Sequence, residues 1–262
     1  ASCDRVASEP VRCIQVDSPS SLFLITKSFI PTHNSVLWGQ IWYNVVHKYG
    51  VPIGVASFET QPKPHMRRQL RTLYTGLLEM HQSPQMQKEA DDWINEHYFF
   101  FAHPEQTPSI EWFLGVAEVA VVRHGAKIIQ ADPWNRCEDS RRQGENETDY
   151  IRRVLRTIHV FAQDMNVHVQ IIAHPAKMGS ERRNSPPMLE DVSGSKHFEN
   201  LSDAGFAIHS PEIGKNRPDG SRNTDVDFYV RKARFDALGY PCKLKLRLDL
   251  QSGRFVSIPN EE

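Results

Sequence analysis

A run of three polar residues, His33, Asn34 and Ser35, has the side chains needed to cut and rejoin a peptide chain. The amide of Asn34 can attack its own backbone carbonyl, which closes a succinimide and breaks the chain after Asn34. His33 is placed to protonate the leaving amine or to polarise that carbonyl. The hydroxyl of Ser35 can accept an acyl group from another chain end, as the nucleophile of covalent catalysis does. The three residues predict a processing junction, and the alternative is a polar turn after Pro31.

Three ionisable side chains, Glu59, Asp132 and His174, end apolar runs that read as strands. An acid after a buried strand can hold Mg²⁺ through its water shell, because this ion takes few direct protein ligands and bridges phosphate oxygens. Asp132 is the candidate for this role. Glu59 is the candidate to orient a water for attack on a γ-phosphate. Taken singly, each acid is more often a helix cap or a loop carboxylate, so the interpretation depends on finding both together with His174.

Hydrophobic periodicity predicts the elements that must position these side chains. Strands are expected over 51–59, 126–133 and 167–175, and helices over 35–49, 66–80 and 149–166. A strand, a helix and a strand in succession over 126–175 form a parallel crossover unit. The fold class is therefore α/β, with a mostly parallel sheet covered by helices on both faces. Shorter strands are expected over 204–209, 225–233 and 244–250.

Composition limits the classes of protein that the chain can belong to. With 262 residues, a net charge of −1 and 39% hydrophobic residues, it should form one large soluble domain with a small appendage. Nucleic-acid binding must then come from local loops and not from a basic body. The four cysteines are far apart and show no C-x-x-C spacing, which indicates neither a zinc site nor a disulfide framework and favours a reducing compartment. No segment has the length of a membrane span, so we expect a cytoplasmic protein without a membrane partner.

The residues before the junction strengthen the processing hypothesis. A hairpin is predicted over 11–26, followed by the segment 29–34 that ends in His-Asn. Together they resemble the C-terminal end of an intein. The resemblance implies that Asn34 is the cyclising residue, that His33 assists it, and that Ser35 is the first residue of the downstream extein. Ser21 departs from the pattern, because many inteins carry a second His at that point.

The phosphate-binding loop of an ATPase is the motif that is missing. No Gly-x-x-x-x-Gly-Lys-Ser/Thr occurs, although phosphates need such a backbone cradle and its lysine. A Walker A motif ends in Lys followed by a Ser or Thr that binds Mg²⁺, so an intein inserted between those two residues would leave Ser35 at the start of the helix. Residues 1–34 would be the intein segment, and residues 35–262 an ATPase core without its first strand and P-loop. We therefore expect a fragment, or the C-terminal partner of a split pair, whose upstream fragment carries the N-terminal intein part and the Walker lysine.

Five short motifs in the main domain resemble motifs of a known family. They are SFET at 57–60, DPWN at 132–135, AHP at 173–175, DVSGS at 191–195 and RKARF at 231–235. In this order they resemble hexameric replicative helicases of the DnaB and Twinkle type, most closely phage-type primase-helicases, from residue 35 to about 257. The resemblance implies a RecA-like fold, ATP and Mg²⁺ as cofactors, a homo-hexameric ring and single-stranded DNA as a partner.

The same resemblance assigns roles to single residues. Glu59 is the catalytic acid, Asp132 is the Walker B acid and also a Mg²⁺ ligand, and His174 is the sensor that links the γ-phosphate to DNA. Lys232 and Arg234 match the Lys-x-Arg pair that reaches into the ATP site of the neighbouring subunit. A cation supplied in trans neutralises charge in the transition state.

The run Ser193, Gly194, Ser195 and Lys196 matches the central-channel loop that grips single-stranded DNA. Glycine lets backbone amides approach a phosphate, and Lys196 adds a charge contact. The alternative is a Ser-Gly turn that caps a helix.

Two functions of different class remain open at this point. The first is a ring motor that hydrolyses ATP and translocates along single-stranded DNA. The second is a RecA-like DNA-binding ATPase or regulatory module without processive helicase activity. A ring motor should lose hydrolysis on Arg234→Ala and regain it when mixed with subunits damaged only at Glu59, because the two residues act in one shared site.

Overall fold

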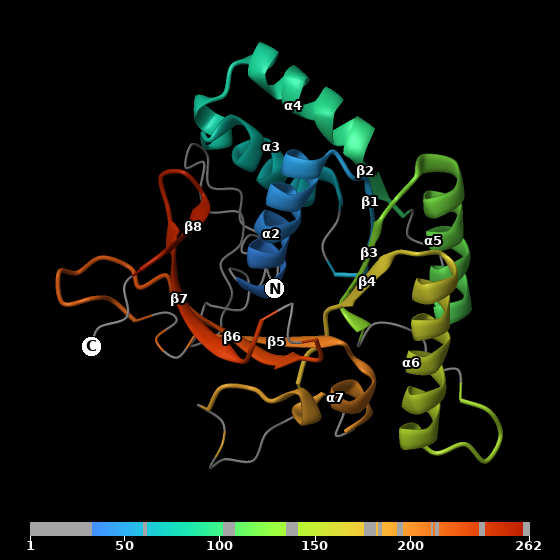
Figure 1. The fold of residues 1–262 in the computed structure, drawn as a ribbon. Coiled ribbons are helices and arrows are strands. Elements are labelled where there is room, and N and C mark those ends of the chain that lie inside the picture. Colours follow the sequence, from blue (N-terminus) through green and yellow to red (C-terminus); the bar gives the residue numbers. More distant parts are fainter. Residues whose placement is uncertain are drawn as a thin grey trace, which may run out of the picture.

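The computed structural model describes most of the chain after residue 32. The described residues are 33–59, 62–101, 108–134, 141–175, 182, 185–192, 196–210, 212, 215–235 and 239–258, with the backbone alone for 33 and 34. The predicted hairpin over 11–26 lies outside these residues. Two four-stranded sheets lie on either side of helix α2 (His33–Tyr49), which crosses the centre of the view in Figure 1.

The first sheet is parallel throughout, as predicted. It has the order β2-β1-β3-β4 and consists of β1 (Ile53–Ser57), β2 (Tyr98–Phe100), β3 (Ile128–Asp132) and β4 (His168–Ile171). The three predicted strands are present but shorter at their ends. Strand β2 was not predicted, because three residues directly after a helix carry too little pattern to be read.

Helices cover both faces of the parallel sheet, which confirms the predicted fold class. One face is covered by α2, α3 (Arg67–Thr75) and α4 (Pro84–His97), and the other by α5 (Ile110–His124) and α6 (Glu147–Asp164), which stand side by side in Figure 1. The strands alternate between these two layers. Val55 and Ile128 pack with the first layer, whereas Ala56, Ile129 and Ala131 pack with the second. Burial on both faces explains why β1 and β3 read as continuous apolar runs.

The predicted helix over 66–80 is wrong in its second half. Helix α3 ends at Thr75 because Gly76 adopts a left-handed conformation with φ of 70° and its N–H bonds to the carbonyl of Thr72. A 3₁₀ turn, η3 (Glu79–His81), follows, and a short irregular helical turn, η2 (Pro62–Met66), precedes α3.

Helices α4 and α5 were not predicted, although the sequence carries their start signals. Ser83 and Ser109 cap them by accepting hydrogen bonds from the N–H groups of Met86 and Trp112. Pro84 at the first turn of α4 is a further start signal.

The second sheet is antiparallel and has the order β5-β6-β7-β8. It consists of β5 (Ala204–His209), β6 (Asp225–Ala233), β7 (Cys242–Asp249) and β8 (Arg254–Ser257). β5 and β6 match their predicted ranges, β7 begins two residues earlier than predicted, and β8 was not predicted. These strands form a sheet of their own and do not extend the parallel one.

Helix α2 joins the two sheets. Leu37 is buried against Val226, Phe228 and Phe255 of the antiparallel sheet. The side chain of Gln40 pairs with the backbone of Phe255 in both directions, at 2.9 Å and 2.6 Å. Because Ser35 belongs to the same helix, packing on both sides holds it in register with the parallel sheet.

Membrane-spanning helices and disulfides can be assessed only for the described residues. None of the helices in the described ranges combines the length and apolar character that a bilayer crossing requires. Cys242 is exposed and forms no disulfide, and the other three cysteines lie outside the described residues.

Candidate functional site

Ser35 and Asp132 meet at the carboxyl edge of the parallel sheet. Alternation along β3 puts Asp132 on the same face as Ile128, which is the face covered by α2. Ser35 lies in the first turn of α2, and its Oγ donates a hydrogen bond to Oδ2 of Asp132 at 2.8 Å. The two residues are 97 positions apart in the chain. The structure therefore brings together the two predicted Mg²⁺ ligands.

The carboxyl group of Asp132 is held in an unusual environment. The residue is only 6% exposed, and burial raises its pKa to about 6. The hydrogen bond from Ser35 lowers this pKa, the nearby charge of Glu59 raises it and His174 lowers it. A buried carboxylate with a raised pKa lacks a full counter-charge, which a cation would supply.

The donor set of this pair suits Mg²⁺. A carboxylate oxygen and a hydroxyl oxygen are hard ligands, and Mg²⁺ commonly takes one or two protein ligands and leaves its remaining positions to water and substrate phosphates. Among the residues the structure describes, no cluster of three or more His, Cys, Asp or Glu could enclose a metal ion. Ser35 and Asp132 thus fit an ion that is shared with a phosphate ligand.

Glu59 and His174 form a second pair at the same edge. Glu59 follows β1 and His174 follows β4, and these strands flank β3 in the sheet. Nε2 of His174 lies 3.6 Å from Oε2 of Glu59. Their side chains are 38% and 33% exposed, so both can reach a bound substrate while Asp132 stays buried.

The support of the site was not predicted from the sequence. A cavity of about 30 Å³ lies beside Ser35 and Asp132, and its lining includes Tyr98, whose hydroxyl is buried without a hydrogen-bond partner. This volume holds about one water and no nucleotide. Nε1 of Trp42 donates to Oε1 of Gln170 at 2.5 Å, which ties α2 to β4. The signal that the sequence offered for this support was a glutamine inside each of two predicted strands, Gln130 in β3 and Gln170 in β4.

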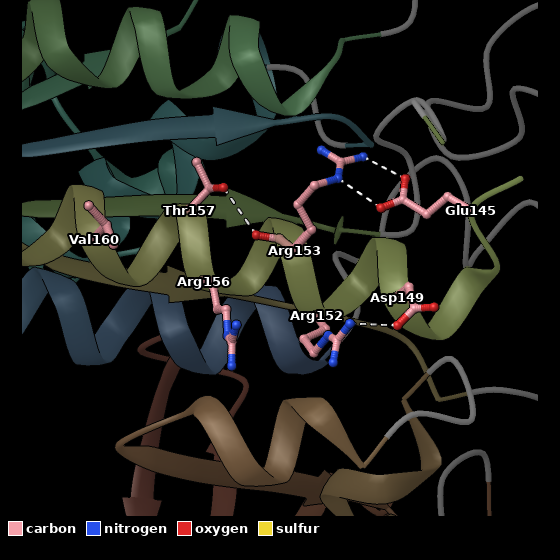
Figure 2. A pocket seen from close by; sticks show the side chains of 7 residues that line it. All are labelled: Glu145, Asp149, Arg152, Arg153, Arg156, Thr157 and Val160. Atoms are coloured by element: carbon pink, nitrogen blue, oxygen red, sulfur yellow. Dashed lines mark hydrogen bonds and ion pairs between the residues drawn. The ribbon is translucent and has the colours of Figure 1, made fainter. Parts of the chain in front are cut away.

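A larger hollow than this cavity lies elsewhere on the described surface. It measures about 510 Å³ on the outer side of α6, and Figure 2 shows its lining residues, which run from Glu145 to Val160. Arg153 pairs with Glu145 at 2.9 Å and Arg152 with Asp149 at 2.8 Å. These charges are compensated within the hollow and no predicted site residue lines it, so we place the candidate site at Asp132.

The predicted DNA loop falls mostly outside the described residues. Ser193, Gly194 and Ser195 are among those left undescribed, while Lys196 is exposed and stands immediately before the short helix α7 (His197–Leu201). The N-cap of α7 is Lys196, and its side chain makes no capping hydrogen bond.

Lys232 and Arg234 contact a different part of the subunit. Nη1 of Arg234 lies 2.7 Å from Oδ1 of Asp203, and Nη2 donates to the carbonyl of Asn200 at 2.9 Å. Nζ of Lys232 donates to the carbonyl of Glu199. In the described part of the chain their hydrogen bonds therefore go to α7 and the residues after it, and not to the Asp132 edge.

The peptide bond of the predicted processing junction lies inside a helix. The predicted helix start at Ser35 is two residues late, because α2 begins at His33 and its first turn contains the Asn34–Ser35 bond. The side chains of His33 and Asn34 are outside the described structure.

Comparisons with known proteins show what the whole chain is similar to. No model of a protein family matches the chain. Over 252 residues the chain is 28% identical to the Twinkle homolog protein, chloroplastic/mitochondrial, of Arabidopsis thaliana. This alignment covers 92% of the chain and 34% of the relative. The chain is 23% identical over 241 residues to the replicative DNA helicase DnaB of Mycobacterium leprae, covering 88% of the chain and 39% of the relative.

Two solved structures share the fold. One is an isolated ATPase domain, which superposes with a TM-score of 0.69 at 16% identity, covering 87% of this chain and 82% of that one. The other is a DnaB-like replicative helicase, with a TM-score of 0.68 at 16% identity, covering 87% of this chain and 56% of that one. The chain spans about a third to two-fifths of the length of the two relatives above. It is homologous to replicative helicases of the DnaB and Twinkle type over their ATPase domain.

Proposed function

We propose that this chain is the C-terminal part of an ATP-dependent replicative DNA helicase that translocates on single-stranded DNA. The observation that carries the proposal is the 2.8 Å hydrogen bond between Ser35 and Asp132, at the sheet edge where Glu59 and His174 also meet. Two oxygen ligands beside a solvent-accessible acid and an imidazole form the arrangement that phosphoryl transfer to water requires. The homology to replicative helicases supports DNA as the track.

Each residue of the edge has a distinct part in this proposal. Ser35 and Asp132 hold Mg²⁺, which supplies charge neutralisation when it is bound with ATP. The carboxylate of Glu59 accepts the proton of the attacking water. His174, 3.6 Å from Glu59, acts as the sensor because it can bond either to this carboxylate or to a phosphate oxygen.

The remaining parts of the motor require other copies and other segments. Arg234 and Lys232 supply positive charge to the ATP of the neighbouring subunit in a homo-hexameric ring. Ser193, Gly194, Ser195 and Lys196 bind the single strand. The Walker lysine and its phosphate cradle come from the upstream fragment and are joined to Ser35 by splicing.

The junction is compatible with this order of events. The first turn of a helix has N–H groups without intrahelical partners, so opening it around Asn34 and Ser35 breaks few backbone hydrogen bonds. Ser35 then acts first as the splicing nucleophile and later as a Mg²⁺ ligand.

Hydrolysis is expected to depend on the upstream fragment. The chain alone lacks the lysine and amide cradle of the β- and γ-phosphates, so its ATP turnover should stay at background, and splicing to the upstream fragment should restore it. The measurement is phosphate release from the chain before and after splicing. Equal rates in both samples would overturn the idea of an interrupted Walker motif.

The ring is tested by mixing two inactive proteins. Spliced Arg234→Ala subunits should lose DNA-stimulated hydrolysis by about 10³-fold, since a cation supplied in trans contributes on this scale. Mixing them with Glu59→Gln subunits should restore part of the activity, because an intact Glu59 then meets an intact Arg234 across an interface. Loss without restoration would favour the alternative, a RecA-like ATPase or regulatory module that is not a processive motor.

A further inference from the structure

We infer that Asp203 is a positioning residue for Arg234: it holds the guanidinium on the C-terminal end of α7 and so keeps it from the neighbouring ATP until α7 moves. The inference rests on the proposed function, because it takes Arg234 to act in trans. The inference assigns a role to Asp203, which none of the sequence motifs includes, and explains why ATP hydrolysis would depend on bound DNA.

Three contacts dock Arg234. Its Nη1 lies 2.7 Å from Oδ1 of Asp203, its Nη2 donates to the carbonyl of Asn200 at 2.9 Å, and its backbone N–H donates to the carbonyl of Asp203 at 2.8 Å. Lys232 donates in parallel to the carbonyl of Glu199. The last carbonyls of a helix have no intrahelical partner, and cations bind favourably there. Both predicted trans-acting residues therefore cap α7 of their own subunit.

The side chain of Arg234 can leave Asp203 at a small cost in free energy. The side chains of Arg234 and Asp203 are 39% and 46% exposed, and ion pairs this accessible to water contribute little to stability. The backbone of Arg234 stays fixed, because Ala233 pairs with Ala204 at the adjoining ends of β6 and β5. Only the side chain has to turn. A phosphate of higher charge can thus compete with Asp203 for the guanidinium.

Helix α7 also contacts the other proposed sites. The ring of Phe198 packs edge-on against Trp134 with centroids 6.1 Å apart, and Trp134 lies two residues after Asp132. The N–H of Trp134 bonds to the carbonyl of Ile172 at 2.7 Å, so this ring is fixed at the site edge. Lys196, at the other end of α7, belongs to the proposed DNA loop. A strand bound at Lys196 that shifts α7 would move the carbonyl of Asn200 and release Arg234.

The experiment uses the spliced, assembled protein with Asp203→Asn. Removing the carboxylate charge should raise ATP turnover without DNA about two- to five-fold, the range expected for loss of one exposed ion pair. The DNA-stimulated rate and KM for ATP should change little, so the stimulation ratio falls by the same factor. Asp203→Glu, which keeps the charge, should restore most of the ratio. Asp219→Asn is the matched control, because this exposed carboxylate bonds to Ser221 in a turn that does not belong to α7.

The outcomes separate this inference from the proposed function. The double variant Asp203→Asn with Arg234→Ala should fall to the rate of Arg234→Ala alone. If Arg234→Ala leaves hydrolysis unchanged, the trans role in the proposed function is wrong. If Arg234→Ala abolishes hydrolysis while Asp203→Asn leaves the DNA-free rate unchanged or lower, or Asp219→Asn changes the ratio equally, the positioning role is wrong. Thermal unfolding reports the folding of each variant, and Asp203→Ser replaces Asp203→Asn if the latter does not fold.

Discussion

Asn34→Ala is expected to abolish release of the segment that begins at Ser35, because alanine has no side-chain amide to attack the scissile carbonyl. His33→Ala should slow release by about 10²-fold or more through loss of acid-base assistance. Ser35→Ala should block ligation to the upstream fragment and still allow cleavage after Asn34, since cyclisation needs only the amide and the carbonyl. The three variants therefore predict three different product patterns.

Mass spectrometry of the purified chain, incubated with its upstream fragment, distinguishes these patterns. A product that starts at Ser35 and a partner that ends in a succinimide are the expected species. Ser28→Ala is a matched control, because it changes a hydroxyl close to the junction in the sequence without removing any reacting group. An intact mass for the unchanged chain after incubation would mean that residues 29–35 form an ordinary structural segment.

Glu59→Gln in the spliced protein is expected to lower the hydrolysis rate by about 10² to 10⁴-fold while leaving binding of Mg²⁺ and ATP nearly unchanged. Glutamine keeps the size of the side chain and its distance to His174 but cannot accept the proton of the attacking water. Asp132→Asn should instead weaken Mg²⁺-dependent nucleotide binding, because it removes the anionic oxygen that pairs with Ser35. The two acids thus separate chemistry from binding.

Single-turnover hydrolysis and nucleotide binding, each measured over a range of Mg²⁺ concentrations, check this separation. Glu118→Gln is the matched control for Glu59→Gln, since Glu118 is an exposed carboxylate within α5 and is not one of the predicted site residues. Normal hydrolysis by Glu59→Gln would show that another group is the base. Equal binding by Asp132→Asn and the unchanged protein would remove Asp132 from the metal site.

Local patterns were sufficient where one segment supplies all of its own signal. The strands around Val55 and Ile129 are short apolar runs with a polar residue at the end, as strands buried on two faces must be. The predicted ranges of β5 and β6 match the observed strands residue by residue. Helix α3 was predicted too long because the sequence does not distinguish a glycine that ends a helix in the left-handed conformation, as Gly76 does, from a glycine inside a helix.

The sequence by itself determined the α/β class, the parallel strands and the acids and imidazole at their ends, since these depend on neighbours in the chain. The tertiary structure decided which of them meet. Pairing of β1 and β4 with β3 brings Glu59 to His174, and packing of α2 on the Asp132 face brings Ser35 to Asp132. The docking of Arg234 on Asp203 depends on the β5–β6 register. Such contacts depend on register and helix docking between distant segments, which no local spacing encodes.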